Sequence, residues 1–150
     1  MRDEVEFWGV ETEEQEERFR EIVEDRTKNS PFYTHIGMKI VGLGPGESRM
    51  RITVEDFLRN AGGIVHGGAI ASLADASAGV ALATLVPGGS KRVITLEQKI
   101  NFMAAAWEGN LHGTGRVLRK GKEIGVVEAE VRDDKGTLVA KSMATFLIIR

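Results

Sequence analysis

Between Asn60 and Val86 the chain reads NAGGIVHGGAIASLADASAGVALATLV. From residue 61 to residue 90 the only formally charged side chain is that of Asp75. A carboxylate within an apolar segment is costly to bury unless it is paired, hydrogen-bonded or protonated. Because perturbed carboxylates concentrate at functional sites, Asp75 is the first candidate for a chemical role.

Two glycines, Gly67 and Gly68, stand where the apolar segment begins. Backbone N–H groups at the start of a helix have no partner within the helix. Together with the positive end of the helix dipole they can polarise a carbonyl oxygen or hold a developing oxyanion. A tight strand-to-helix turn also explains a glycine pair, but it gives no reason for a carboxylate eight positions further on. Ser72 and Thr84 make residues 68–86 a poor membrane span, so we expect a buried helix.

Strand-like segments flank this helix on both sides. Residues 49–54 alternate apolar and polar side chains, as expected of a half-buried strand. We expect strands over residues 38–43, 49–54, 91–102, 110–119, 123–132 and 137–149. One central helix with strands before and after it predicts an antiparallel sheet wrapped around that helix, in the α+β class.

The N-terminal region has a different pattern. Thr12 begins a capping-box spacing, which predicts a helix over residues 13–28 with an acidic, solvated outer face. Ser30 before Pro31 predicts a short helical turn that packs Phe32 and Ile36. We therefore divide the chain into an N-terminal helical extension, residues 1–30, and one main domain, residues 31–150.

Composition excludes several kinds of chemistry. The 150 residues suffice for one domain and include no cysteine, which rules out disulfides, thiolate metal sites and cysteine nucleophiles. The three histidines show no metal-ligand spacing, so we expect no metal. Residues 42–46 lack the third glycine of a dinucleotide-binding motif and the lysine of a P-loop. No Gly-x-Ser-x-Gly elbow is present.

The charges are unevenly distributed. Residues 1–25 carry 11 acidic and 3 basic side chains, whereas the remainder carries 11 acidic and 17 basic ones. A mildly basic domain suits an anionic small ligand, although scattered solvated lysines explain the balance equally simply. Residues 1–6 are acidic and lack an apolar signal core, so we expect a cytoplasmic protein without a membrane partner.

Several residues stand at offsets that match a known family. Asn60, the run Val65-His66-Gly67-Gly68, and Leu73-Ala74-Asp75 resemble the hotdog-fold acyl-CoA thioesterases of the PaaI-like (phenylacetate-pathway) type. The resemblance covers roughly residues 31–149. It implies the hotdog fold, here with an extra N-terminal helix, and hydrolysis of an acyl-CoA thioester without a cofactor.

The resemblance also implies roles for individual residues. Asp75 matches the catalytic carboxylate, which acts as general base on water or as nucleophile, and Gly67 matches the backbone donor to the thioester carbonyl. Asn60 and His66 match residues that orient the reacting groups, and Thr95 matches one that positions the water. The residues expected to contact the substrate are Val65, Gly68, Phe102 and the basic turn Arg119, Lys120, Gly121 and Lys122. A solvated hairpin explains that basic turn equally well.

Two other functions stay open at this point. One is a non-catalytic acyl-CoA-binding module on the same fold. The other is a hotdog dehydratase, although its His/Glu or Asp/His pattern is not recognisable around His66. A single N-terminal helix is too short for a helix-turn-helix, so no nucleic-acid partner is expected. Aromatic acyl groups of the phenylacetyl type and medium-chain aliphatic ones are both open.

Helix geometry predicts that two chains share one site. Gly67 and Asp75 differ by eight positions, roughly 12 Å along a single helix. An oxyanion donor and a base should each lie within about 3 Å of their reacting atoms. A twofold dimer with antiparallel central helices brings Gly67 of one chain near Asp75 of the other. The resemblance implies the same homodimer, often paired again into a homotetramer.

Overall fold

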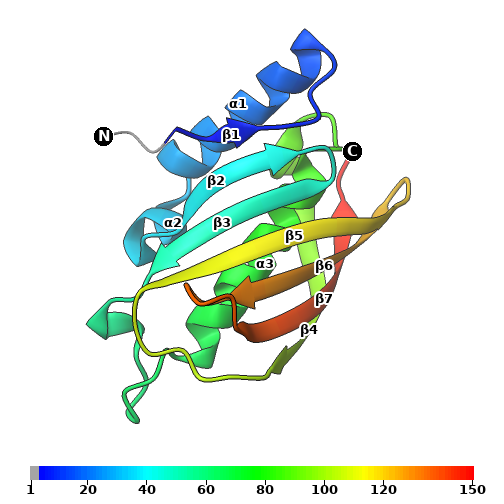
Figure 1. Ribbon diagram of the computed structural model, residues 1–150. Helices are drawn as coiled ribbons and strands as arrows, with labels where there is room; N and C mark the ends of the chain where they lie inside the picture. Colours follow the sequence, from blue (N-terminus) through cyan, green and yellow to red (C-terminus); the bar gives the residue numbers. More distant parts are fainter. Residues whose placement is uncertain (1–3) are drawn as a thin grey trace.

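A computed structural model describes residues 4–150, and the strands of this part of the chain form one seven-stranded sheet. The strand order is β1-β2-β3-β5-β6-β7-β4, and all neighbouring pairs are antiparallel except β1 with β2. The strands are β1 (Glu6–Phe7), β2 (Lys39–Gly44), β3 (Glu47–Thr53), β4 (Val93–Phe102), β5 (Asn110–Lys120), β6 (Ile124–Arg132) and β7 (Leu138–Ile148). The sheet curves around the long helix α3 (Gly67–Ala83), as Figure 1 shows. The predicted α+β hotdog architecture is confirmed.

Small residues let α3 approach the sheet closely. A Cβ atom on Gly115 of β5 would lie only 2.1 Å from the carbonyl oxygen of Ser77 on α3. The Ser48 hydroxyl of β3 donates a hydrogen bond to the same carbonyl at 2.6 Å. Leu73 and Leu82, on the sheet side of α3, are fully buried. The glycines and the apolar side of the helix therefore fix where α3 lies.

Helix α1 (Glu13–Lys28) matches its predicted bounds, and its capping box is formed by Thr12 and Gln15. Its apolar side packs on the start of the sheet: the rings of Phe19 and Phe7 meet edge to face, 5.5 Å apart. In Figure 1 α1 runs along β1 and β2. Strand β1 was not expected, because two residues are too few to show a periodicity. Part of the acidic segment 1–6, residues 1–3, lies outside the described residues.

The prediction for helix α2 (Pro31–Ile36) was wrong in two details. Ser30 occupies the N-cap position, but its side chain makes no capping hydrogen bond. Phe32 is 54% exposed, and the buried ring is that of Tyr33. Tyr33 and Ile36 are three positions apart and share the inner side of this short helix, which leaves Phe32 pointing outward.

Two short 3₁₀ helices complete the chain, η1 (Asp56–Leu58) and η2 (Gly89–Arg92). The second occupies the start of the segment expected to be a strand from residue 91, so β4 begins at Val93. No helix within residues 4–150 is long and apolar enough to cross a membrane. The division at residue 30 stays a prediction.

Candidate active site

The start of α3 leaves one backbone donor available. His66 is the N-cap residue, and its Nδ1 atom accepts a hydrogen bond from the backbone N–H of Gly68 at 2.7 Å. A neutral imidazole that accepts at Nδ1 carries its proton on Nε2. The N–H of Gly67 has no acceptor among the described residues. The first turn therefore offers two donors to a ligand, the Gly67 N–H and the His66 Nε2–H.

The loop before α3 is held in one conformation by its own hydrogen bonds. Asn60 Oδ1 accepts from the Gly62 N–H at 2.9 Å, which leaves the Nδ2 group of Asn60 as a donor. The Arg59 guanidinium donates to the carbonyl oxygen of Gly63 at 2.8 Å and also to that of Trp107. The loop thus holds Asn60 beside the helix start. Because its Oδ1 atom is bonded to the Gly62 N–H, its Nδ2 group is the part that can bind a ligand.

Asp75 lies on the side of α3 that faces away from the sheet centre, and Thr95 of β4 contacts it. The Thr95 hydroxyl donates a hydrogen bond to Asp75 Oδ1 at 2.7 Å, across 20 positions of sequence. A second contact joins the same elements, since Gln98 Nε2 donates to the Ala71 carbonyl at 3.3 Å. At the far end of β4, the Phe102 ring lies 3.3 Å from where a Cβ atom of Gly67 would be. Strand β4 therefore runs antiparallel to α3 along the whole site.

A pocket of about 210 Å³ opens beside Asp75, and we call it the Asp75 pocket. Its polar lining includes Ser72 and Thr95, while Met38, Val93 and Phe146 contribute apolar surface. Arg26, Phe32 and Tyr33 come from α1 and α2. Burial, more than any other cause, raises the pKa of the Tyr33 hydroxyl; Arg26 opposes the shift and Asp75 adds to it. Tyr33 therefore keeps its proton and faces the pocket as a neutral phenol.

A second pocket, of about 370 Å³, lies along the same side of α3 toward the helix start. It is lined by residues that include His66, Gly68 and His35. Phe32 and Ser72 line both this pocket and the Asp75 pocket. The two spaces therefore adjoin and form one open strip along α3.

Within one chain, the residues predicted from the sequence fall into three groups. Asp75 and Thr95 form the first. The second gathers at the start of α3 and consists of Asn60, His66, Gly67, Gly68 and Phe102. Val65 precedes this group, but its side chain is 2% exposed and belongs to the core, so it forms no wall of an open pocket.

The basic turn, residues 119–122, forms the third group and lies beyond the other end of α3. The N–H of Gly46 donates to Thr84 Oγ1, just after α3, and the N–H of Val117 donates to the Gly46 carbonyl. Gly121 closes the turn through a bond from its N–H to the Ile124 carbonyl at 2.8 Å. The β5–β6 hairpin extends from this end of the sheet in Figure 1. In a single chain the turn is therefore far from the backbone donor at Gly67.

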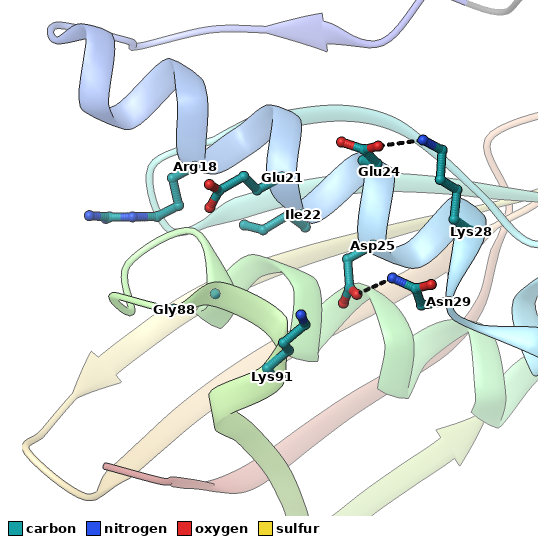
Figure 2. A pocket seen from close by; sticks show the side chains of 10 residues that line it. Arg18, Glu21, Ile22, Glu24, Asp25, Lys28, Asn29, Gly88 and Lys91 are labelled. Atoms are coloured by element: carbon teal, nitrogen blue, oxygen red, sulfur yellow. Dashed lines mark hydrogen bonds and ion pairs between the residues drawn. The ribbon is translucent and has the colours of Figure 1, made fainter.

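Another hollow, of about 430 Å³, lies between α1 and η2 and is shown in Figure 2. Its side chains are mostly charged, and several pair with one another: Lys28 with Glu24, and Asn29 with Asp25. None of the residues predicted to form the site lines it. Within residues 4–150, no group of three or more His, Cys, Asp or Glu side chains is placed to hold a metal ion.

Sequence reasoning missed Arg26 and Tyr33 in the Asp75 pocket. Arg26 lies seven positions after Phe19 and four after Ile22, on the buried stripe of α1. A charged residue on an apolar stripe is the same signal that singled out Asp75.

A sheet wrapped around a helix that carries a backbone donor at its start and a carboxylate at its middle has the parts needed for acyl transfer to water. The family model of the thioesterase superfamily matches residues 62–140, and this chain belongs to that family. Thioester hydrolysis is the activity that this membership supports.

Individual relatives agree with the family assignment. A protein of Saccharolobus solfataricus, whose name proposes an esterase, is 33% identical over 90% of this chain and 95% of its own length. The 1,4-dihydroxy-2-naphthoyl-CoA hydrolase of Escherichia coli is 30% identical over 71% of this chain and 78% of its own.

Solved structures are similar as well. A conserved protein of Pseudomonas aeruginosa is 40% identical, with a TM-score of 0.74, and the match covers 80% of this chain and 94% of that one. PaaI of Escherichia coli, from the phenylacetic acid degradation operon, has a TM-score of 0.77 at 23% identity and covers 89% of this chain and 95% of its own; it shares the fold.

Proposed function

We propose that this protein hydrolyses an acyl-CoA thioester to a free acid and CoA. The observation that carries the proposal is the hydrogen bond from Thr95 to Asp75, 2.7 Å long, at the wall of a pocket on the open side of α3. A thioester is already activated, so hydrolysis needs a positioned water, a carboxylate and a stabilised oxyanion.

Asp75 supplies the carboxylate. The Thr95 hydroxyl uses one lone pair of Oδ1 and fixes the orientation of the carboxylate, so Oδ2 faces the reacting atoms. In one route Asp75 removes a proton from the attacking water; in the other it attacks the acyl carbon itself and water then releases the acid. The Gly67 N–H stabilises the oxyanion in both routes.

Each active site contains residues of two chains in this proposal. The groups at Gly67 and at Asp75 lie roughly 12 Å apart on one helix, too far to act on the same carbonyl. In the sheet of residues 4–150, strand β4 forms a free edge of ten residues, and Ile94 and Leu96 on it are about half exposed. A long, apolar, unpaired edge favours pairing with a second copy. A twofold axis beside β4 places two α3 helices antiparallel and brings Gly67 of one subunit to Asp75 of the other.

The same dimer gives the basic turn a role. In an antiparallel pair of helices, the end of one helix lies near the start of the other. Arg119, Lys120 and Lys122 of one subunit then lie on the side of the partner's helix start, where the CoA moiety of the substrate enters. Three cationic side chains suit the phosphates of CoA. A homotetramer and a cytoplasmic location stay predictions.

The first test measures thiol release from a panel of aliphatic and aromatic acyl-CoAs. Asp75→Asn should lower the rate at least ~10²-fold while the melting temperature stays close to that of the wild type. Glu21→Gln, an exposed carboxylate on α1, is the matched control and should keep the full rate. Tight binding of acyl-CoAs by the wild type without thiol release would instead identify a binding module.

The second test asks whether sites are shared. Asn60→Asp keeps an oxygen for the Gly62 N–H but removes the Nδ2 donor, so the loop should survive while activity falls. This variant and Asp75→Asn are unfolded, mixed and refolded together. A mixed dimer then holds one doubly defective site and one intact site, so up to about a quarter of the wild-type activity should return. Demonstrated subunit exchange without any recovery would rule out shared sites.

A further inference from the structure

Arg26, near the end of α1, has a buried nitrogen that nothing in the structure satisfies. Its Nε atom is shielded from solvent and has no hydrogen-bond partner among the described residues. The guanidinium carbon lies 5.3 Å from the centre of the Tyr33 ring. A buried N–H group without an acceptor costs free energy, and a cation costs more. A ligand acceptor that reaches the terminal nitrogens of Arg26 would stabilise this partly buried cation.

Arg26 forms part of a wall of the Asp75 pocket. Arg26, Tyr33 and Met38 line this pocket on one side and a groove of about 790 Å³ beneath α1 on the other. These three side chains therefore separate the two spaces. An acyl group whose carbonyl lies at Asp75 shares this pocket with Arg26, so its far end can reach this wall.

This wall offers hydrogen-bond donors to the acyl group. The neutral phenol of Tyr33 can donate, and a guanidinium has donors and no acceptor. Arg26 and Asp75 carry opposite charges, and both shift the pKa of the Tyr33 hydroxyl, Arg26 downward and Asp75 upward. Both charges therefore act at the same point of the pocket lining. The pocket is thus lined by a negative group, Asp75, where the thioester reacts, and by a positive group, Arg26.

We propose that Arg26 is a specificity-determining residue that binds a carboxylate at the far end of the acyl group. The substrate class is then the acyl-CoAs of short dicarboxylic acids. The planar fork of arginine matches a carboxylate through two parallel hydrogen bonds, which a lysine cannot form. The pocket that both Asp75 and Arg26 line, of about 210 Å³, has room for a short chain. This inference rests on the proposed thioester hydrolysis.

A different role for Arg26 would be to act on Asp75 alone, as a nearby positive charge. The two roles predict different kinetics. A charge that serves Asp75 affects every substrate equally, because it acts on the shared reacting group. A charge that binds the acyl terminus affects only substrates that carry the carboxylate.

The test compares matched substrates that differ only in the terminal group. The pairs are succinyl-CoA with butyryl-CoA, glutaryl-CoA with pentanoyl-CoA, and adipoyl-CoA with hexanoyl-CoA. For at least one pair the wild type should have the higher kcat/KM with the dicarboxylic member. For that pair, the ratio of kcat/KM with the dicarboxylic member to kcat/KM with the uncharged member should fall about tenfold to a hundredfold in Arg26→Met, which keeps the apolar stem. Arg26→Lys should restore part of this ratio. Arg18→Met, on the same helix but outside the pocket, should leave the ratio unchanged.

Two results would overturn the inference. One is a wild type that prefers the uncharged member of every pair; the other is an equal loss on both members of each pair in Arg26→Met. Failure of the proposed hydrolysis itself would appear differently, as no thiol release from any substrate. In that case calorimetric binding of adipoyl-CoA and hexanoyl-CoA to the wild type and to Arg26→Met tests the role of Arg26 without catalysis. If the wild type bound adipoyl-CoA and hexanoyl-CoA with equal affinity, the proposed role of Arg26 would be rejected.

Discussion

The two sides of helix α3 are built for different purposes. The side toward the sheet is closed: Leu73, Ala74 and Ser77 are fully buried, and glycines on β5 bring the sheet backbone against Leu73 and Ser77. The other side carries Gly68, Ser72 and Asp75, which keep part of their surface and line two adjoining pockets. Residues one or two positions apart in sequence thus serve either the core or the site. Substitutions on the two sides should separate stability from catalysis.

The substitution expected to change stability most is on the closed side, at Gly115. Because its Cβ position is 2.1 Å from the backbone oxygen of Ser77, Gly115→Val can be accommodated only if α3 moves off the sheet. We expect a loss of about 4 kcal/mol or more in unfolding free energy, or no folded protein at all. Thr114→Val, the neighbouring residue on the exposed side of β5, is the control and should unfold near the wild-type denaturant midpoint.

Leu73→Ala should weaken the closed side without removing it. The side chain is fully buried, so truncation leaves a cavity and should cost about 2–5 kcal/mol in unfolding free energy. Urea denaturation measures this cost, and thiol release per folded molecule should stay within a few-fold of the wild type. A rate that fell as far as in Asp75→Asn, two positions away, would show that the two sides of α3 are not independent.

On the open side, Thr95→Val tests the contact with Asp75. The substitution keeps the shape of the side chain and removes the hydroxyl that donates to Oδ1. We expect kcat to fall about tenfold, roughly 1.4 kcal/mol in activation free energy, with little change in unfolding free energy. Thr95→Ser keeps the hydroxyl and should retain most of the rate. Equal rates for the valine and serine variants would leave the hydrogen bond without a catalytic role.

The sequence predicts the elements that form the closed side of α3 and some of the residues that line the open side. Periodicity and capping signals placed the long elements, because each is long enough to repeat its pattern several times. Asp75 was found because a lone carboxylate in an apolar run is costly. Strand β1 was not predicted, because two residues are too few to show a periodicity. The contact between Thr95 and Asp75 depends on how β4 docks along α3, and the chemistry of Thr95 alone gives no sign of it.

The pocket wall formed by α1 and α2 shows what sequence patterns leave open. Phe32 and Tyr33 are adjacent aromatic residues on a six-residue helix, and only docking of that helix decides which ring turns inward. Arg26 could have been found from its place on the buried stripe of α1. Its place in the wall of the Asp75 pocket could not, because that depends on how α1 crosses the sheet.

The substitution expected to change stability least is at Asp134, which lies on neither side of α3. Asp134, in the β6–β7 turn, contacts His112 at 2.7 Å, and its side chain also accepts from the Asn110 N–H. The hydrogen bond with His112, followed by that from Asn110, lowers the pKa of the Asp134 carboxyl. A carboxyl whose pKa is lower in the folded state stabilises the fold above its unfolded pKa, and this stabilisation is lost as the pH falls through the folded pKa.

Asp134→Asn should therefore lower the denaturation midpoint slightly at about pH 6, and the difference from the wild type should shrink toward about pH 3. Thiol release should be unchanged, because Asp134 lines neither pocket beside α3. Asp133→Asn is a poor control, since Asp133 accepts from the N–H groups of Lys135 and Thr137 and so holds the same turn. Asp56→Asn, at an exposed carboxylate beside Arg59, is the better one. A midpoint difference that grew as the pH fell would contradict the assigned direction of the Asp134 pKa.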